Sequence, residues 1–420
     1  MATLRIEGGR PLSGHLTVGG NKNAALPLLS ACLLTSDPCE LHNVPRIRDV
    51  EVLTRLVGKL GVEVTPLGDT AIRMRAGEVA SDEPDRTLVG KLRGSVLLMG
   101  PLLARRGRIV LAPPGGDFPT RRTISTHLVA LENFGARVTD SSDGFVLEAP
   151  DGLRGASFYL DEASVTGTET ALLAAAAARG STEIRHAACE PHVVELCEFL
   201  KSMGAHVEGA GTSTIRVEGT ARLGGATRTL WGDYIEAGSW AVVGAVTRGE
   251  IEVRGARRAD LEPLVSVMQR MQVDCGLDDE RLVVRPSEPV AIRKIATGLW
   301  PSFPSDLVSL ITVLATQARG RTLIHDWMYE LRLFALEQLS GMNADLFLCD
   351  SHRIIVTGPR RLRGKTLDSR DLRSGMSLIA AALAADGESR VAPLETVERG
   401  YAALVERLTS LGAVVEREPD

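Results

Sequence analysis

The stretch TGTETALLAAAAARGSTEI, residues 166–184, contains the pattern that decides the fold. Alanine and leucine fill most positions of its central part, which predicts a helix that is buried on nearly every side. Arg179 and Gly180 interrupt this helix, and the short segment after them has the character of a strand. The same pattern occurs five more times, with starts about 70 residues apart. The other copies are residues 23–41, 95–111, 235–253, 306–324 and 375–391.

A second pattern alternates with the first. It is an amphipathic helix that ends in a tight turn before a strand. The central residues of these turns are Gly61, Gly135, Gly204, Gln272, Asn343 and Gly412. Glycine and asparagine tolerate the left-handed backbone that closes many helices, so Gln272 predicts a helix that ends differently. Two patterns with one period predict six helix–strand–helix–strand units in two domains of three, with the alanine-rich helices inside and the amphipathic helices outside.

The composition excludes several classes of protein. A chain of 420 residues is too long for one ordinary core, and its hydrophobic fraction of 44% is that of a soluble globular protein. The net charge of −5 argues against wholesale binding to nucleic acid or to an anionic membrane. No apolar run approaches the ~20 residues that cross a bilayer, and the N-terminus lacks a secretory signal. We therefore expect a cytoplasmic protein.

The cysteines and histidines give no sign of a metal centre. Six cysteines occur without a Cys-x-x-Cys pair, and eight histidines show no ligand spacing. This distribution predicts reduced, mostly packed thiols rather than a disulfide framework. We expect neither a metal nor another cofactor. The sequence gives no indication of the oligomeric state.

Residues 113–122, PPGGDFPTRR, are the best candidate for the chemistry. Two glycines between prolines can continue neither a helix nor a strand. Asp117 follows directly, and Arg121 and Arg122 precede an amphipathic helix. A carboxylate and two guanidiniums on one loop suit an anionic substrate that must be held and then given a proton. The alternative is a surface loop whose aspartate only caps the next helix.

Polar residues also recur where the buried helices begin. Gly19 and Gly20 leave backbone N–H groups available beside Lys22, which is a ready anion site. Arg93, Asp306 and the segment 371–375 occupy the same point of later units. In a pseudo-symmetric protein these points converge on the domain faces that meet, although the same residues could simply cap their helices.

Six motifs together resemble UDP-N-acetylglucosamine 1-carboxyvinyltransferase, an enolpyruvyl transferase related to 5-enolpyruvylshikimate-3-phosphate (EPSP) synthase. They are GNKNAALPLL (20–29), PGGD with the arginines after it (114–122), FPSD (303–306), YELR (329–332), DLRSGMS (371–377) and ERGY (398–401). The resemblance covers the whole chain. It implies an α/β fold of two lobes, each an inside-out barrel of three βαβαββ units. It implies one lobe of residues 22–231 and another of residues 1–21 with 232–420.

The resemblance also implies a reaction, the first committed step of peptidoglycan synthesis. The enolpyruvyl group of phosphoenolpyruvate moves to the 3-hydroxyl of a uridine nucleotide sugar, UDP-N-acetylglucosamine, and phosphate leaves. Lys22, Arg122 and Arg399 match residues that hold phosphoenolpyruvate. Arg93, Arg332 and Arg373 match further cleft residues, where the planar fork of arginine suits carboxylate and phosphate.

The remaining site residues follow from the same resemblance. Asp306 matches an aspartate beside the sugar 3-hydroxyl, where a carboxylate can accept the proton of the attacking oxygen. Asn23 matches a side chain that binds the same region and would steady the tetrahedral intermediate. Arg121 could contact the diphosphate, although Arg122 beside it could do the same. Ser164 and Val165 also agree with the family pattern near the uracil, and Met328 is a further candidate substrate contact.

Asp117 stands where family members commonly have a cysteine. It would protonate the methylene carbon of phosphoenolpyruvate, which requires that the closed site raise its pKa. Fosfomycin alkylates the family cysteine, and a carboxylate is a poorer nucleophile, so we expect fosfomycin resistance.

The nucleotide end departs from the family pattern. Thr123, Thr126, Glu162, Thr166 and Thr396 replace residues that are common there. One alternative is therefore a specialised enolpyruvyl transferase that acts on another nucleotide, such as the 3′-hydroxyl of UMP in nucleoside-antibiotic synthesis. Another is a catalytically silent regulatory paralogue that binds sugar nucleotide, but the retained lysine, aspartate and arginines argue against it.

Overall fold

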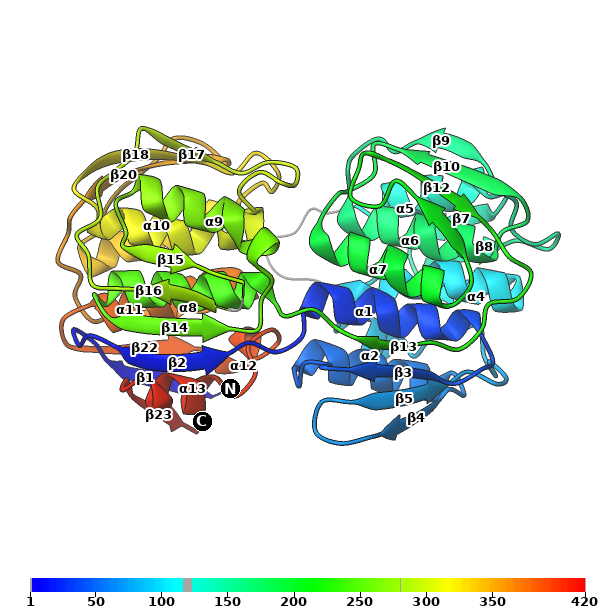
Figure 1. Ribbon diagram of the computed structural model, residues 1–420, viewed down its shortest axis with the longest axis horizontal. Coiled ribbons are helices and arrows are strands. Elements are labelled where there is room, and N and C mark those ends of the chain that lie inside the picture. The colour runs from blue at the N-terminus through cyan, green and yellow to red at the C-terminus, as the bar shows by residue number, and fades with distance from the viewer. Residues whose placement is uncertain (1, 116–122, 280, 420) are drawn as a thin grey trace. The chain divides into compact units, whose positions relative to one another are not determined.

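The computed structural model describes residues 2–115, 123–279 and 281–419. The chain divides into two compact units, and it passes from one to the other at Gly19–Gly20 and again at Trp231–Gly232. We call the unit of residues 20–115 and 123–231 the first lobe. The second lobe consists of the residues up to Gly19 and those from Gly232 onward. Figure 1 shows both units, each coloured along the chain.

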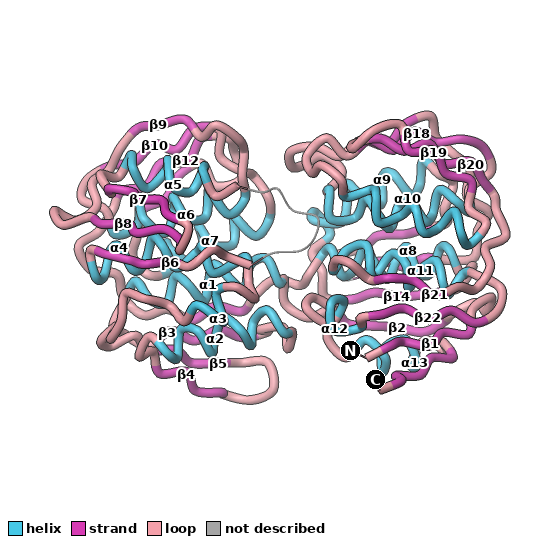
Figure 2. Tube along the Cα trace, turned by 180° about the vertical axis from the view of Figure 1, so that it is seen from behind, coloured by secondary structure: helices cyan, strands magenta, loops and turns pink. Residues whose placement is uncertain are grey.

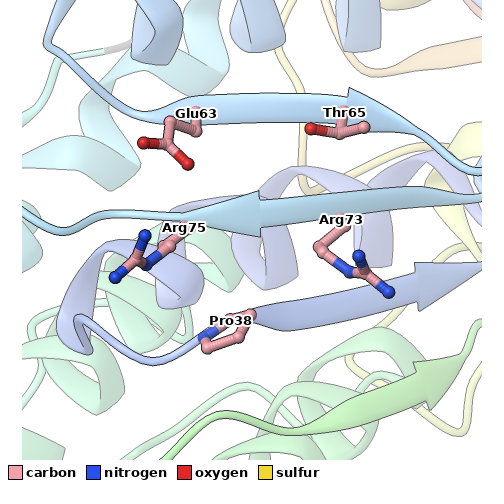
Figure 3. A pocket seen from close by; sticks show the side chains of 5 residues that line it. All are labelled: Pro38, Glu63, Thr65, Arg73 and Arg75. Atoms are coloured by element: carbon pink, nitrogen blue, oxygen red, sulfur yellow. The ribbon is translucent and has the colours of Figure 1, made fainter.

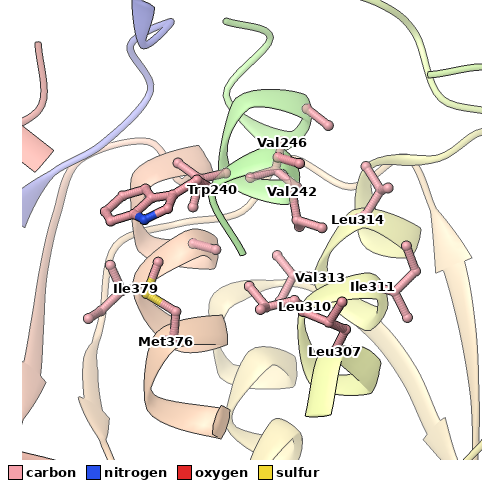
Figure 4. Close-up of a cluster of buried hydrophobic side chains, with 14 of the residues drawn as sticks. Trp240, Val242, Val246, Leu307, Leu310, Ile311, Val313, Leu314, Met376 and Ile379 are labelled. Carbon is pink, nitrogen blue, oxygen red and sulfur yellow. The ribbon is translucent and has the colours of Figure 1, made fainter. Parts of the chain in front are cut away.

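The second lobe is built around three buried helices. They are α8 (Tyr234–Val246), α10 (Val308–Gln317) and α11 (Leu372–Ala384). These helices pack against one another, and every residue of α8 is buried. Trp240, Leu310 and Met376 meet in the resulting core (Figure 4). The prediction that the alanine-rich helices are internal is confirmed, because such helices have no polar face to turn toward water.

Three four-stranded sheets form the outside of the second lobe. Figure 2 shows strands of this lobe in magenta around its cyan helices. One has the order β15 (Cys275–Leu277), β16 (Arg281–Val284), β14 (Glu250–Arg254), β2 (Ser13–Thr17). The next has the order β17 (Lys294–Ala296), β18 (Gly320–His325), β20 (Arg353–Gly358), β19 (Asp345–Leu348). The third has the order β21 (Thr366–Asp368), β22 (Glu388–Ala392), β1 (Thr3–Glu7), β23 (Val414–Glu418). The more peripheral helical segments are α9 (Arg258–Arg270), the 3-10 helix η4 (Arg332–Met342), α12 (Leu394–Val397) and α13 (Leu404–Ser410).

The first lobe repeats this plan. Its inner helices are α1 (Lys22–Ala31), continued by η1 (Cys32–Leu34), then η2 (Arg93–Leu98) with α4 (Met99–Arg106), and α6 (Val165–Ala177). One sheet has the order β13 (Thr227–Thr229), β3 (Cys39–His42), β5 (Ile72–Arg75), β4 (Glu63–Pro66). The next has three strands, in the order β6 (Arg108–Leu111), β8 (Gly144–Glu148), β7 (Arg137–Ser141). The third has the order β11 (His206–Glu208), β12 (Thr214–Glu218), β10 (Ser181–Arg185), β9 (Ser157–Tyr159). Its other helices are α2 (Arg48–Lys59), α3 (Arg86–Val89), α5 (Ser125–Asn133) and α7 (Pro191–Ser202).

Each crossing strand pairs with one lobe and leads into the other. Strand β2 pairs in parallel with β14 of the second lobe, yet the next element is α1 of the first lobe. Strand β13 pairs in parallel with β3 of the first lobe and leads into α8 of the second. Each crossing therefore ends at a helix cap. Asn21 caps α1, and Asp233 caps α8.

The six turns at the ends of the outer helices share one backbone conformation. Their central residues all have positive φ, including Gln272 at 60° and Asn343 at 77°. The expectation that Gln272 ends its helix differently is wrong. Its N–H donates to the carbonyl of Gln269 at 2.9 Å, as the N–H of Gly204 does to Lys201. The geometry that joins helix to strand in each unit therefore overrides the local preference of glutamine. The fifth outer helix differs in another way, because it is the 3-10 helix η4.

No helix among the described residues is long and apolar enough to cross a membrane. The same residues contain no group of three or more histidine, cysteine, aspartate or glutamate side chains arranged to hold a metal ion.

Candidate functional site

Asp306 lies at the entry to α10 with each carboxylate oxygen held by a different arginine. It belongs to the 3-10 turn η3 (Ser305–Leu307) directly before that helix. Arg332 Nη1 lies 3.0 Å from Oδ1, and Arg373 Nη2 lies 2.9 Å from Oδ2. The Asp306 side chain keeps 26% of its surface exposed, against 12% for Arg332 and 8% for Arg373. The carboxylate is thus fixed in orientation and still partly accessible.

Arg373 is positioned by the first turn of α11. Asp371 caps this helix by accepting the N–H groups of Arg373 and Ser374. The guanidinium also donates to the hydroxyl of Tyr401 at 3.5 Å, and that hydroxyl bonds to Ser239 at 2.7 Å. Burial alone would lower the pKa of Arg373, but Asp306 foremost, followed by Tyr401, raises it above its usual value. Arg373 therefore stays charged.

Arg332 begins η4, directly after Leu331, which has a left-handed φ of 66°. Its guanidinium lies over the ring of Tyr329, 4.3 Å from the centroid. It also donates to the hydroxyl of Ser305 at 2.9 Å. Burial opposes its charge, but Asp306 and then Tyr329 raise the pKa of Arg332. Met328, in the segment just before, donates its N–H to Asp326 at 3.3 Å.

Arg399 lies in the turn after α12 and is half-buried. Helix α12 packs against α11. Gly400, the next residue, has no room for a side chain, because an added Cβ would lie 2.7 Å from Leu372 at the start of α11. This close approach fixes the Arg399 turn against the helix that carries Arg373.

In the first lobe, Lys22 forms a buried ion pair at the start of α1. Its Nζ lies 2.8 Å from Oδ2 of Asp49, and the two side chains are 11% and 4% exposed. Asp49 comes from the first turn of α2. Asn23, the next residue, is half-buried and donates its backbone N–H to the Asn21 cap. Breaking such a buried pair is costly, so Asp49 fixes the position of the ammonium group.

A second group of the first lobe joins the segments 123–127 and 161–166. Arg93 donates to the carbonyl of Thr123 at 2.6 Å. Thr126 donates to Asp161 at 2.7 Å, and the ring of buried His127 bonds to Thr166 at 2.9 Å. Ser164 caps α6 by accepting the N–H of Gly167, and Val165 is the first residue of that helix. Three of the residues that depart from the family pattern, Thr123, Thr126 and Thr166, therefore form hydrogen bonds within this group.

The predicted residues thus fall into separate groups. In the second lobe, Arg332 and Arg373 both contact Asp306, and the Arg399 turn packs against the helix that carries Arg373. Lys22 and Asn23 start α1 of the first lobe, whereas Arg93, Ser164 and Val165 belong to the group around α6. Asp117, Arg121 and Arg122 lie outside the described residues.

Comparison with known proteins decides the family. The family described as EPSP synthase (3-phosphoshikimate 1-carboxyvinyltransferase) matches residues 6–408. The UDP-N-acetylglucosamine 1-carboxyvinyltransferase of Bradyrhizobium diazoefficiens is 42% identical, covering 99% of this chain and 98% of the relative. The enzyme of the same name from Treponema denticola is 40% identical, with 98% of each chain covered. The chain belongs to the EPSP synthase family of carboxyvinyltransferases.

Two solved structures have a similar fold. The enolpyruvyl transferase NikO from Streptomyces tendae superposes with a TM-score of 0.89 at 25% identity, covering 100% of this chain and 99% of NikO. EPSP synthase from Acinetobacter baumannii has a TM-score of 0.78 at 18% identity, with full coverage of both chains. The prediction of an inside-out α/β barrel is confirmed by these similarities together with the buried helices and outer sheets.

A hollow elsewhere on this carboxyvinyltransferase contains none of the predicted residues. It has a volume of about 400 Å³ and lies on the sheet that contains β4 and β5 (Figure 3). Its lining residues are Pro38, Glu63, Thr65, Arg73 and Arg75. Arg73 is paired with Glu40, and Glu63 faces Arg75 across the two strands. The charges on this surface are thus largely offset by neighbours.

Several residues of the site groups were not predicted from the sequence. Asp49 has a detectable signal, because it lies twelve residues before Gly61, as buried Asp260 lies twelve residues before Gln272. Tyr401 is part of the ERGY motif but carries no sign of its contact with Arg373. Asp326 has no signal in the sequence, because the hydroxyls that it accepts come from Thr297 and Ser305, which are 29 and 21 residues away.

Proposed function

We propose that this chain transfers the enolpyruvyl group of phosphoenolpyruvate to the 3-hydroxyl of UDP-N-acetylglucosamine and releases phosphate. This would be the first committed step of peptidoglycan synthesis, and so part of cell-wall formation and cell division, carried out in the cytoplasm. The names of the relatives at about 40% identity support the acceptor. The observation that carries the proposal is the Asp306 carboxylate, which Arg332 and Arg373 hold by one oxygen each.

Asp306 can orient the acceptor hydroxyl and then take its proton. The contacts with Arg332 and Arg373 stabilise the ionised form of Asp306. A carboxylate is a weak base toward a free alcohol. The hydroxyl becomes strongly acidic only as its oxygen bonds to C2 of the enolpyruvyl group. Proton transfer to Asp306 is then favourable in the transition state.

The methylene carbon must gain a proton before or during this attack. Asp117 is the proposed donor, and its carboxyl group would have to be protonated in the substrate complex. The resulting tetrahedral adduct loses phosphate by cleavage of the C2–O bond, and a proton leaves the methyl group to restore the vinyl ether. Lys22, Arg122 and Arg399 are proposed to bind the phosphate and carboxylate of the donor. Arg121 is proposed to contact the diphosphate, while Asn23 and Met328 are proposed to contact the acceptor sugar.

A second candidate acceptor is favoured by the hydrogen bonds around Thr126 and His127. The resemblance leads us to expect apolar residues and a lysine near the uracil. Thr126 here bonds to Asp161, and His127 bonds to Thr166. These polar side chains would suit a nucleotide other than UDP-N-acetylglucosamine, for example UMP, which would accept the enolpyruvyl group on its 3′-hydroxyl.

Phosphate release from phosphoenolpyruvate separates these candidates. It is measured with UDP-N-acetylglucosamine, with UMP and without nucleotide. The proposal predicts turnover with UDP-N-acetylglucosamine at a kcat/KM at least ~100-fold above that with UMP. The reverse order would identify the specialised enzyme, and no turnover with either would indicate the silent paralogue.

A further inference from the structure

Asp326 is a completely buried carboxylate that is linked through Ser305 to Arg332, one of the two arginines that contact Asp306. It follows β18 directly, and its relative exposure is 0%. Oδ1 accepts the hydroxyl of Thr297 at 2.7 Å and the N–H of Met328 at 3.3 Å. Oδ2 accepts the hydroxyl of Ser305 at 2.8 Å. Its backbone is anchored as well, because its N–H donates to the carbonyl of His352 at 2.9 Å.

The hydroxyl of Ser305 connects Asp326 to the arginine that holds Asp306. Ser305 donates its single proton to Asp326. Its oxygen is therefore left to accept, and it accepts from Arg332 Nη1 at 2.9 Å. The same nitrogen lies 3.0 Å from Oδ1 of Asp306. An uninterrupted chain of hydrogen bonds thus runs from Asp326 through Ser305 and Arg332 to Asp306.

We propose that Asp326 is a positioning residue for carboxyvinyl transfer, which fixes Arg332, and through it Asp306, by orienting the hydroxyl of Ser305. This inference rests on the proposed function for its catalytic part. Asp326 does not touch the reacting atoms. It ensures that Ser305 presents a lone pair, and not a proton, to the guanidinium. A residue that only filled space at this point would place no constraint on the direction of that hydroxyl.

Thr297 provides a matched control inside the same network. Thr297 and Ser305 each donate one hydroxyl to Asp326, and both residues are buried, at 3% and 5% exposure. Only Ser305 continues to Arg332 among the hydrogen bonds of the described residues. A purely structural role for Asp326 predicts similar effects when either hydroxyl is removed. A positioning role predicts an effect on Asp306 chemistry only through Ser305.

The first arm of the test measures kcat and KM for Asp326→Asn, Ser305→Ala, Thr297→Val and the double variant D326N/S305A. Asp326→Asn and Ser305→Ala are expected to lower kcat at least ~10-fold while KM for phosphoenolpyruvate changes less than ~3-fold. Thr297→Val is expected to keep kcat within about 2-fold of the parent. The double variant is expected to be no slower than the slower single variant, within about 2-fold, because both changes break one chain.

The second arm does not depend on turnover. Rotation of the Arg332 guanidinium is followed by nitrogen-15 NMR, with its Nε–H signal assigned by its loss in Arg332→Lys. Asp326→Asn and Ser305→Ala should speed this rotation at least ~3-fold, whereas Thr297→Val should leave it within about 2-fold of the parent. Should Asp326→Asn fail to fold, the comparison of Ser305→Ala with Thr297→Val decides the question.

The outcomes separate this inference from the proposed function. The inference would be overturned if Ser305→Ala and Thr297→Val had equal effects on both kcat and guanidinium rotation. It would also be overturned if Asp326→Asn kept the kcat and the rotation rate of the parent protein. In both cases, turnover by the parent protein would still support the transferase. If the parent protein showed no turnover but the variants showed the predicted differences in rotation, the proposed function and the catalytic role of Asp326 would be refuted. The same result would still support the conclusion that Asp326 restrains the Arg332 guanidinium.

Discussion

Nη2 of Arg373 lies 2.9 Å from Oδ2 of Asp306, and the arginine exposes only 8% of its side chain. Arg373 Nε lies 3.2 Å from the same oxygen, so two nitrogens of one guanidinium hold it. Arg332 Nη1 contacts the other carboxylate oxygen, Oδ1, at 3.0 Å. Asp306 is therefore a carboxylate whose direction is set by two largely buried cations, which suits a group that must meet one particular hydroxyl.

Replacing Asp306 by asparagine should abolish most turnover and destabilise the second lobe. Arg332 and Arg373 would each lose a carboxylate partner, which we expect to lower the free energy of unfolding by about 2–4 kcal/mol. We expect kcat to fall at least ~100-fold, because the attacking hydroxyl loses its proton acceptor. Phosphate release and urea denaturation measure the two effects. Asp345→Asn, which removes an exposed partner of Arg360, is the control. Similar kcat values for both variants would refute the role of Asp306.

His127 should make the protein less stable in acid. Burial, and then the charge of Arg93, lower the pKa of His127 to about 3, whereas the unfolded value is about 6.5. Below pH 6.5 the unfolded chain gains a proton that the folded chain does not. The free energy of unfolding should then fall by up to about 1.4 kcal/mol per pH unit from this residue alone. Above pH 6.5 its contribution should not change.

The variant His127→Gln tests this pH dependence, because glutamine can still bond to Thr166. Urea denaturation at pH 7, 6 and 5 should give a smaller loss of stability for the variant, by about 1 kcal/mol per pH unit. Identical slopes for the two proteins would show that His127 titrates normally.

Gln272→Gly should stabilise the protein. Gln272 has a φ of 60°, and a left-handed backbone costs a residue with a side chain roughly 1–2 kcal/mol. Glycine removes this strain but loses more entropy on folding, so the net gain should be about 0.5–1 kcal/mol. The matched control is Gly204→Ala at the equivalent turn, where an added Cβ meets no atom within 4 Å. It should destabilise by about 1 kcal/mol through the backbone alone. A Gln272→Gly variant that unfolds more easily would contradict the shared-turn explanation.

Asp117 should make the enzyme insensitive to fosfomycin, as proposed from its position on the loop. We expect parental activity to survive incubation with the epoxide, and Asp117→Cys to be inactivated progressively, because a thiolate is the stronger nucleophile. Asp117→Asn should lose turnover, because an amide cannot supply the proton. An adduct on Asp117 itself would contradict the first expectation, and an Asp117→Asn enzyme with parental kcat the second.

The repeat could be predicted because each unit carries two local signals, an alanine-rich helix and a turn that favours glycine. Gln272 shows the limit of such signals, since its turn forms in spite of its own preference. Asp306, Arg332 and Arg373 were found through motifs. The sequence could not show that each arginine binds a different oxygen of Asp306, because Asp306 and Arg373 are 67 residues apart in the chain. Asp326 could not be found at all, since its importance arises only where β18 ends beside Ser305.

Enolpyruvyl transfer by this protein is tested most simply by one reaction in D₂O with phosphoenolpyruvate and UDP-N-acetylglucosamine, followed by NMR. We expect equal amounts of phosphate and of a vinyl ether at the 3-oxygen of the sugar. We also expect deuterium in the methylene group of that product, because the carbon is protonated and later loses a proton. Phosphate release no faster than without the sugar nucleotide, or a product that contains no deuterium, would contradict these expectations.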